Sequence, residues 1–116
     1  MKSIKNLVWA MLLSAIPAMA ASHSATLTWT PGADDTGFNV YRSSAACPTT
    51  AVTTTTAGFS KIGSATSPTY VDSTVTVGLF CYFVTGTAGG AESAPSNDVN
   101  VAITPFAPTV LTVIAQ

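Results

Sequence analysis

The chain has 116 residues, of which 47% are hydrophobic, 8% are charged and 9% are aromatic, and its formal net charge is −1. Without the N-terminal leader proposed below, 96 residues remain, with two basic and five acidic side chains and a net charge of −3. This length suffices for one small domain with a single core. Two cations cannot neutralise a run of phosphates, which excludes a nucleic-acid-binding surface. A chain so rich in apolar residues is not a disordered polyelectrolyte.

The first 20 residues have the three parts of a secretory signal peptide. A basic start at Met1–Lys5 precedes about ten apolar residues at 7–16, and Ala18–Ala20 supplies the small residues that signal peptidase requires. The apolar run is too short for a membrane span, which needs about 20 residues. We therefore predict cleavage before Ala21 and a secreted protein, extracellular, on the cell surface or periplasmic, with no stable membrane span after cleavage. An uncleaved N-terminal anchor is the alternative.

If the protein is exported, its two cysteines are expected to be oxidised. Cys47 and Cys81 both lie in the mature part of the chain. An even number of cysteines in an oxidising compartment indicates a disulfide. A closed loop of this length stabilises a domain by roughly 3–4 kcal/mol in the loop-entropy model. The alternative is a metal pair, but no histidine or second cysteine pair lies nearby in the sequence, so we expect no metal site.

The mature chain has the alternation typical of short strands. Period-two patterns with β-branched residues predict strands at 25–30, 38–42, 59–62, 69–72, 79–85 and 98–103. A Ser-, Thr- and Ala-rich segment at 43–58 predicts a long loop tethered by the disulfide. No mature segment has sustained helical periodicity, so we predict an all-β antiparallel sandwich at residues 21–103. The residues predicted for its core are Leu27, Trp29, Phe38, Val40, Tyr70, Phe80, Tyr82 and Val84.

Six short motifs follow one another at informative spacing. They are Leu27–Thr30, Gly37–Arg42, Phe59–Ile62, Thr69–Asp72, Phe80–Thr85 and Glu92–Asn97. In order and spacing they resemble a bacterial fibronectin type III domain over residues 24–103, as its strands B, C, C′, E and F and the approach to strand G. The resemblance implies an immunoglobulin-like sandwich with Trp29 as the core tryptophan. The two cysteines resemble a bridge from the C–C′ loop to strand F that some bacterial members have.

The chain departs from this family at its ends. Only Ala21–Ser24 of the mature chain precede strand B, so strand A is missing from the N-terminus. The C-terminal segment 104–116 instead contains Ala107-Pro108, then Leu111 and Val113, which resembles a strand A at the wrong end. We interpret 104–116 as a Pro-containing linker and a donor-like strand. Its candidate assembly residues are Val110, Leu111, Val113 and Ile114.

Chain geometry limits where this tail can go. In the family, strands A and G run in the same direction. The tail would therefore have to run back along the length of the sandwich to take the strand A position of its own domain. A seven-residue strand spans roughly 23 Å, whereas the five-residue linker Thr104–Pro108 reaches at most roughly 17 Å. Three possibilities remain: donation to the next subunit in a head-to-tail homopolymer, a monomer whose tail folds back in reverse direction or is loosely ordered, and a fragment of a longer multi-domain protein.

Residues that could carry catalysis are few. His23 lies beside the mature N-terminus, where nothing holds it for a triad, and Asp34-Asp35 has no calcium-loop pattern. We therefore expect no enzyme and no cofactor. The sequence predicts a structural subunit that forms an extracellular filament. The alternative is a monomeric secreted spacer or binding module for a glycan or surface protein, with Tyr41 and Phe83 as its candidate ligand face.

Overall fold

The computed structural model describes residues 21–115, so the predicted signal peptide at 1–20 lies outside the described part of the chain. The described residues form seven strands and no helix. The strands are β1 (Ala25–Thr28), β2 (Gly37–Ser43), β3 (Phe59–Ala65), β4 (Thr69–Asp72), β5 (Gly78–Ala88), β6 (Ala91–Glu92) and β7 (Val99–Ile103).

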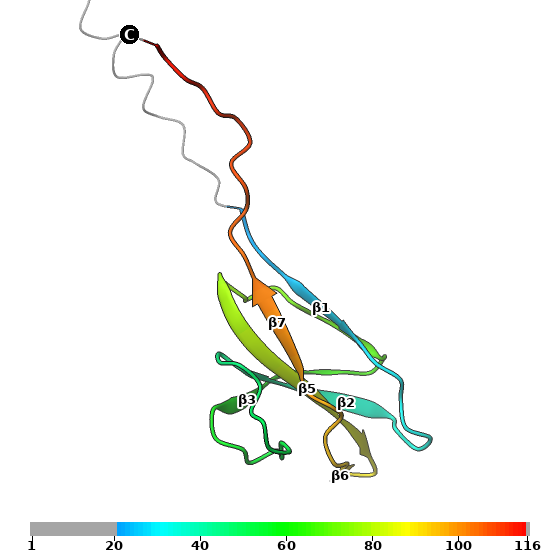
Figure 1. Ribbon diagram of the computed structural model, residues 1–116. Coiled ribbons are helices and arrows are strands. Elements are labelled where there is room, and N and C mark those ends of the chain that lie inside the picture. Colours follow the sequence, from blue (N-terminus) through cyan, green and yellow to red (C-terminus); the bar gives the residue numbers. More distant parts are fainter. Residues whose placement is uncertain (1–20, 116) are drawn as a thin grey trace, which may run out of the picture.

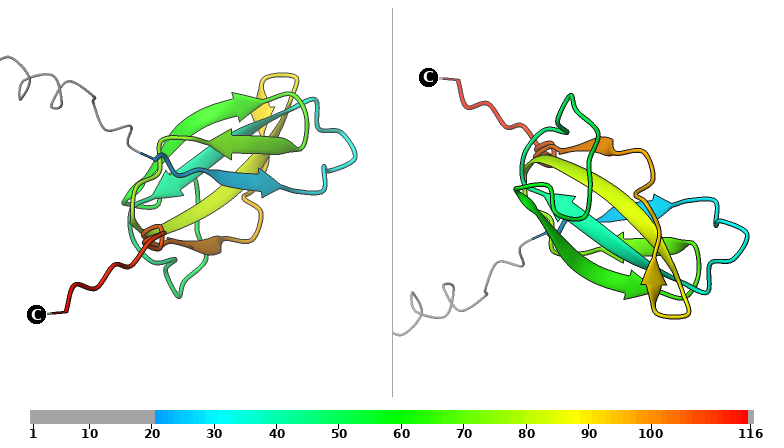
Figure 2. Two further views of the ribbon diagram at one scale, coloured as in Figure 1. Left: turned by 90° about the horizontal axis from the view of Figure 1, so that it is seen from above. Right: turned by 90° about the horizontal axis from the view of Figure 1, so that it is seen from below.

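The strands form two antiparallel sheets that face each other (Figures 1 and 2). The small sheet holds β1 and β4, and the large sheet has the order β3-β2-β5, with β6 and β7 both paired to β5. This arrangement confirms the prediction of an all-β, immunoglobulin-like sandwich. A register shift between Val40 and Tyr41 interrupts the β2–β3 ladder.

The strand β5 is the longest element because its residues are apolar on both faces. Phe80, Tyr82 and Val84 point between the sheets, and Cys81 and Phe83 point outward, yet all five are buried. The strand continues to Ala88, three residues further than predicted, and a two-residue turn then leads into β6. Both turn residues, Gly89 and Gly90, have positive φ, as a type I′ hairpin requires.

The core lies between the two sheets. Its buried members are Ala25, Phe38, Val40, Val75, Phe80, Tyr82 and Val84. The remaining predicted core residues, Leu27, Trp29 and Tyr70, pack against this cluster but are only partly buried. Trp29 meets Phe38 edge-on with 5.2 Å between ring centroids. The partly buried residues Leu27 and Trp29 lie along β1 and its continuation, where the small sheet has only two strands.

The outer face of the large sheet carries a second apolar layer. Tyr41 stacks on Phe83 with 4.7 Å between ring centroids, and Phe59 packs on Phe83 at 4.9 Å. Only 9% of Tyr41 and 1% of Phe83 are exposed, so the prediction that these two residues form a ligand face was wrong. The physical reason is that Tyr41 and Phe83 stack on each other and Phe59 packs on Phe83, contacts that the sequence pattern does not indicate.

One carboxylate connects the two sheets. Asp72 of β4 accepts hydrogen bonds at 2.7 Å from Arg42 of β2 and from the Tyr82 hydroxyl of β5. Thr74 donates to the other carboxylate oxygen through its backbone N–H at 3.0 Å and its hydroxyl at 2.7 Å. A buried charge is tolerated only when it is paired and hydrogen-bonded, and Asp72 satisfies both conditions.

Candidate assembly groove

The strand β1 has an unpaired edge. It pairs with β4 on one side, and no other strand of residues 21–115 lies against its other side. Successive residues of a strand direct their backbone groups to opposite sides. Because Trp29 N donates to Pro68 O on the β4 side at 3.2 Å, the backbone groups of Thr26, Thr28 and Thr30 face the open side. This edge offers a ladder to a further strand.

A groove runs beside this edge. Its volume is about 490 Å³, and it opens between β1 and the strands β5 and β7 of the opposite sheet. The apolar side chains along it include Leu27, Trp29, Val84, Val99 and Val101. The other lining residues are threonines, a serine, an asparagine and aromatic residues of β5, so none carries a charge.

The groove leaves apolar surface in contact with solvent. Val99 is half exposed although its neighbours on the same face of β7, Val101 and Ile103, pack against the core. The Trp29 indole N–H is buried and has no hydrogen-bond partner among the described residues. The exposure of Val99 indicates an incomplete cover over one end of the core.

The C-terminal tail lies away from the sandwich. In Figures 1 and 2 the segment after β7 extends from one end of the domain and does not fold back over either sheet. The four predicted assembly residues, Val110, Leu111, Val113 and Ile114, are 78–89% exposed. The reversed, folded-back tail is therefore not the arrangement in this structure. Near the start of the tail, Phe106 stacks on His23 with 4.1 Å between ring centroids.

The tail leaves the sandwich at the end where β1, the strand beside the groove, begins. The strand β1 begins at the same end of the sandwich at which β7 finishes (Figure 1). We call this end the exit pole, and the end that carries the turn at 31–36 the far pole. A strand antiparallel to β1 would therefore start at the far pole and finish at the exit pole. The tail leaves the domain where such a strand would end.

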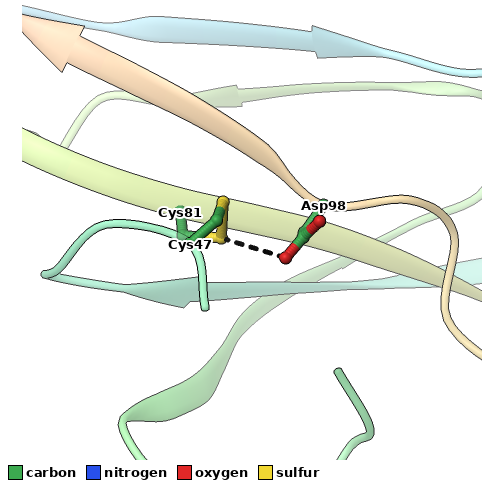
Figure 3. A group of neighbouring side chains, drawn as sticks. All are labelled: Cys47, Cys81 and Asp98. Atoms are coloured by element: carbon green, nitrogen blue, oxygen red, sulfur yellow. Dashed lines mark hydrogen bonds between the residues drawn. A yellow bond between two sulfur atoms is a disulfide. The ribbon is translucent and has the colours of Figure 1, made fainter. Parts of the chain in front are cut away.

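The disulfide predicted between Cys47 and Cys81 is present. Figure 3 shows that Asp98 lies beside it, and Cys81 Sγ is 3.9 Å from the carboxylate oxygen of Asp98. The three residues are close enough together to hold a metal ion. However, metal binding to cysteine requires thiolates, and both sulfurs are engaged in the bond to each other.

The outer edge of the large sheet carries a polar cluster that the sequence analysis did not identify. The Glu92 carboxylate accepts hydrogen bonds from the hydroxyls of Tyr41 and Thr85, both at 2.6 Å, and from the Asn39 amide at 2.9 Å. Hydrogen bonds from Asn39, Thr85 and Tyr41 lower the pKa of Glu92. These contacts attach the short strand β6 to its sheet, so we assign the cluster a structural role.

Comparison with protein-family models and with curated proteins finds no match for this chain. Within residues 21–115, no helix is long and apolar enough to cross a membrane.

Proposed function

We propose that this protein is a secreted, non-catalytic structural subunit of the fibronectin type III type. Each subunit donates its C-terminal tail to the β1 groove of the next one, as in other cases of β-strand addition in trans. The observation that carries the proposal is that one chain contains both an unpaired strand edge beside an apolar groove and an exposed apolar segment that could fill it. The buried disulfide is compatible with export.

The position of the tail favours donation to another copy over antiparallel insertion into its own groove. To run antiparallel to its own β1, the tail would have to reverse at the exit pole, cross to the far pole and reverse again. Six residues, 104–109, separate β7 from the apolar segment, and they reach at most roughly 22 Å when fully extended. Two of them are prolines, which restrict the turns further. A neighbouring molecule placed along the axis needs no reversal.

The contact uses two different surfaces, so a pair of subunits still leaves one groove and one tail free. The tail of one subunit meets the groove of a second, whose own tail remains available to a third. Such a heterologous contact continues indefinitely when rotation does not close a ring. A filament is the expected product.

Two variants test the proposal: one can only donate its tail, and the other can only accept a tail. The Thr28 N–H faces the open edge, so Thr28→Pro removes a donor from the groove edge and leaves the β1–β4 ladder intact. This variant can donate its tail but accepts one poorly. Deletion of residues 107–116 removes the tail, whose described part lies away from the sandwich, and gives a molecule that can only accept.

We expect the wild-type protein to form filaments by negative-stain electron microscopy, and each variant alone to remain monomeric by light scattering. A mixture of the two variants should give a 1:1 heterodimer and nothing larger. Thr28→Ala, which keeps the N–H, is the control and should polymerise. A tail-deleted protein that still polymerises, or a wild-type protein that stays monomeric at high concentration, would overturn the proposal and leave a secreted monomeric spacer module.

A further inference from the structure

We infer that the groove accepts the tail in one direction, on one face and in one register. The donated segment of a second copy runs antiparallel to β1, with Leu111 opposite Trp29 and Val113 opposite Leu27. This inference rests on the proposed function and identifies which donor residues occupy the groove.

The direction follows from strand pairing. Every pair of neighbouring strands in the described chain is antiparallel, and an antiparallel ladder is slightly more stable per residue than a parallel one. The direction of the inserted tail also decides whether the assembly is a closed dimer or an open chain of subunits. A tail parallel to β1 would bring two exit poles together, where two copies could exchange tails and stop at a closed dimer. Antiparallel insertion from the far pole keeps the chain of subunits open.

The face follows from the composition of the tail. Opposite residues of an antiparallel pair point to the same face of the sheet, and Leu27 and Trp29 are the groove residues of β1 that point toward the core. Two apolar donor side chains, Leu111 and Val113, have the matching spacing of two residues. The other face would place the Thr112 hydroxyl in the middle of an apolar groove, at a cost in desolvation. A slip of one residue exchanges the two faces completely.

The register follows from proline and from the extent of the groove. With Leu111 opposite Trp29, the residues that hydrogen-bond to the open edge are Val110 with Thr30, Thr112 with Thr28 and Ile114 with Thr26. Pro108, which has no N–H, then falls beyond the ladder. A shift of two residues in one direction would place Pro108 opposite Thr30 and lose a hydrogen bond. The opposite shift would place Leu111 opposite Pro31, outside the groove lining.

Site-directed cysteine pairs test direction and face together. The acceptor is the tail-deleted protein with Thr26→Cys, and the donors are Thr28→Pro proteins with Ile114→Cys, Val110→Cys or Val113→Cys. Hydrogen-bonded antiparallel pairs have Cα atoms about 5.5 Å apart, which lies within the range that a disulfide spans. Mixing acceptor with each donor under mild oxidation and running a non-reducing gel gives the readout.

We expect a shift to the mass of a covalent dimer with Ile114→Cys and none with the two other donors. A crosslink through Val110→Cys instead would show parallel insertion, and one through Val113→Cys would show the other face inside, and either result overturns the inference. If the 1:1 complex forms by light scattering but no Ile114→Cys crosslink appears, the register is wrong and the proposed function stands. If no complex forms, both fail.

Discussion

Asp72 is the residue on which the two sheets depend most directly. Burial alone would raise the pKa of Asp72, but hydrogen bonds from Thr74, Tyr82 and Arg42 outweigh burial and lower the pKa to about 2. The pKa of Tyr82 is raised by burial and by its hydrogen bond to the carboxylate. The network is therefore organised around an ionised Asp72 and a neutral Tyr82.

The shift of Asp72 predicts acid sensitivity. Its folded pKa of about 2 lies below the ordinary value of 3.8, so the ionised group stabilises the fold fully above about pH 4. That contribution is lost as the pH falls toward 2. Two pKa units correspond to about 2–3 kcal/mol, and we expect the free energy of unfolding from urea titrations to fall by about this amount.

Asp72→Asn tests the assignment. It leaves Arg42 without its charged partner, so we expect a loss of about 3 kcal/mol at pH 7 and a smaller further loss on acidification. Asp34→Asn is the matched control, because Asp34 lies in an exposed turn and its side chain accepts no hydrogen bond within the described residues, so this variant should behave as the wild type. An unchanged acid response in Asp72→Asn would assign the pH dependence to other groups.

At the scale of elements, the long loop between β2 and β3 is held by one covalent bond. The disulfide connects Cys47 in this loop to Cys81 in β5 across 34 residues of sequence, and it lies next to Phe83 of the outer apolar layer. Few regular hydrogen bonds order the loop, apart from a small turn at Thr53–Thr56. Most residues of 44–58 are exposed, so little packing constrains this segment besides the disulfide.

Removal of the disulfide should weaken the fold strongly. We expect the double variant Cys47→Ala and Cys81→Ala to lose roughly 3–4 kcal/mol in free energy of unfolding, because a loop of this length is no longer constrained in the unfolded chain. Calorimetry or urea titration measures the loss. We also expect hydrogen exchange to increase in residues 44–58 more than in β5. Equal stability with and without the bond would contradict this account.

Much of the fold could be predicted at this scale. Alternation located the strands because side chains of a strand point alternately to two faces, and the predicted starts lie within one residue of the observed ones. The end of β3 was missed because Gly63, Ser64 and Ala65 carry no apolar alternation, and only pairing with β2 defines them as strand. Alternation also does not indicate which side chains pack together on an outer face, which is why Tyr41 and Phe83 were misassigned.

The candidate site was only partly visible in the sequence. The tail was recognisable as an apolar segment after two prolines. The groove was not, because its lining comes from β1, β5 and β7, and their approach depends on the whole fold. The hydrogen-bonded carboxylates Asp72 and Glu92 were missed for the same reason, since their partners lie up to 53 residues away in sequence.

At the scale of the whole molecule, the proposed contact between subunits contains no ion pair. The described tail from Thr104 to Ala115 and the lining of the groove have no acidic or basic side chains; Tyr82, which lines the groove, is neutral. Residues 21–116, the proposed mature subunit, carry a net charge of −3, so neighbouring subunits would repel each other weakly, and salt screens that repulsion.

Assembly should therefore be nearly insensitive to ionic strength. We expect the critical concentration, measured by light scattering, to change by less than about two-fold between about 0.05 M and about 0.5 M NaCl, with a decrease in the direction of higher salt. A steep increase in critical concentration with salt would show that charged groups hold the subunits together, and the groove would then not be the contact.

The stacking of Phe106 on His23 places the N-terminal arm, residues 21–24, beside the start of the tail. In a growing fibre, every joint would therefore carry the N-terminal arm of one molecule at its surface. A peptide or small domain fused ahead of Ser22 would be displayed once per joint, at a spacing set by the length of one sandwich. The fibre would in that case hold the attached peptides or domains at regular, fixed distances along its length.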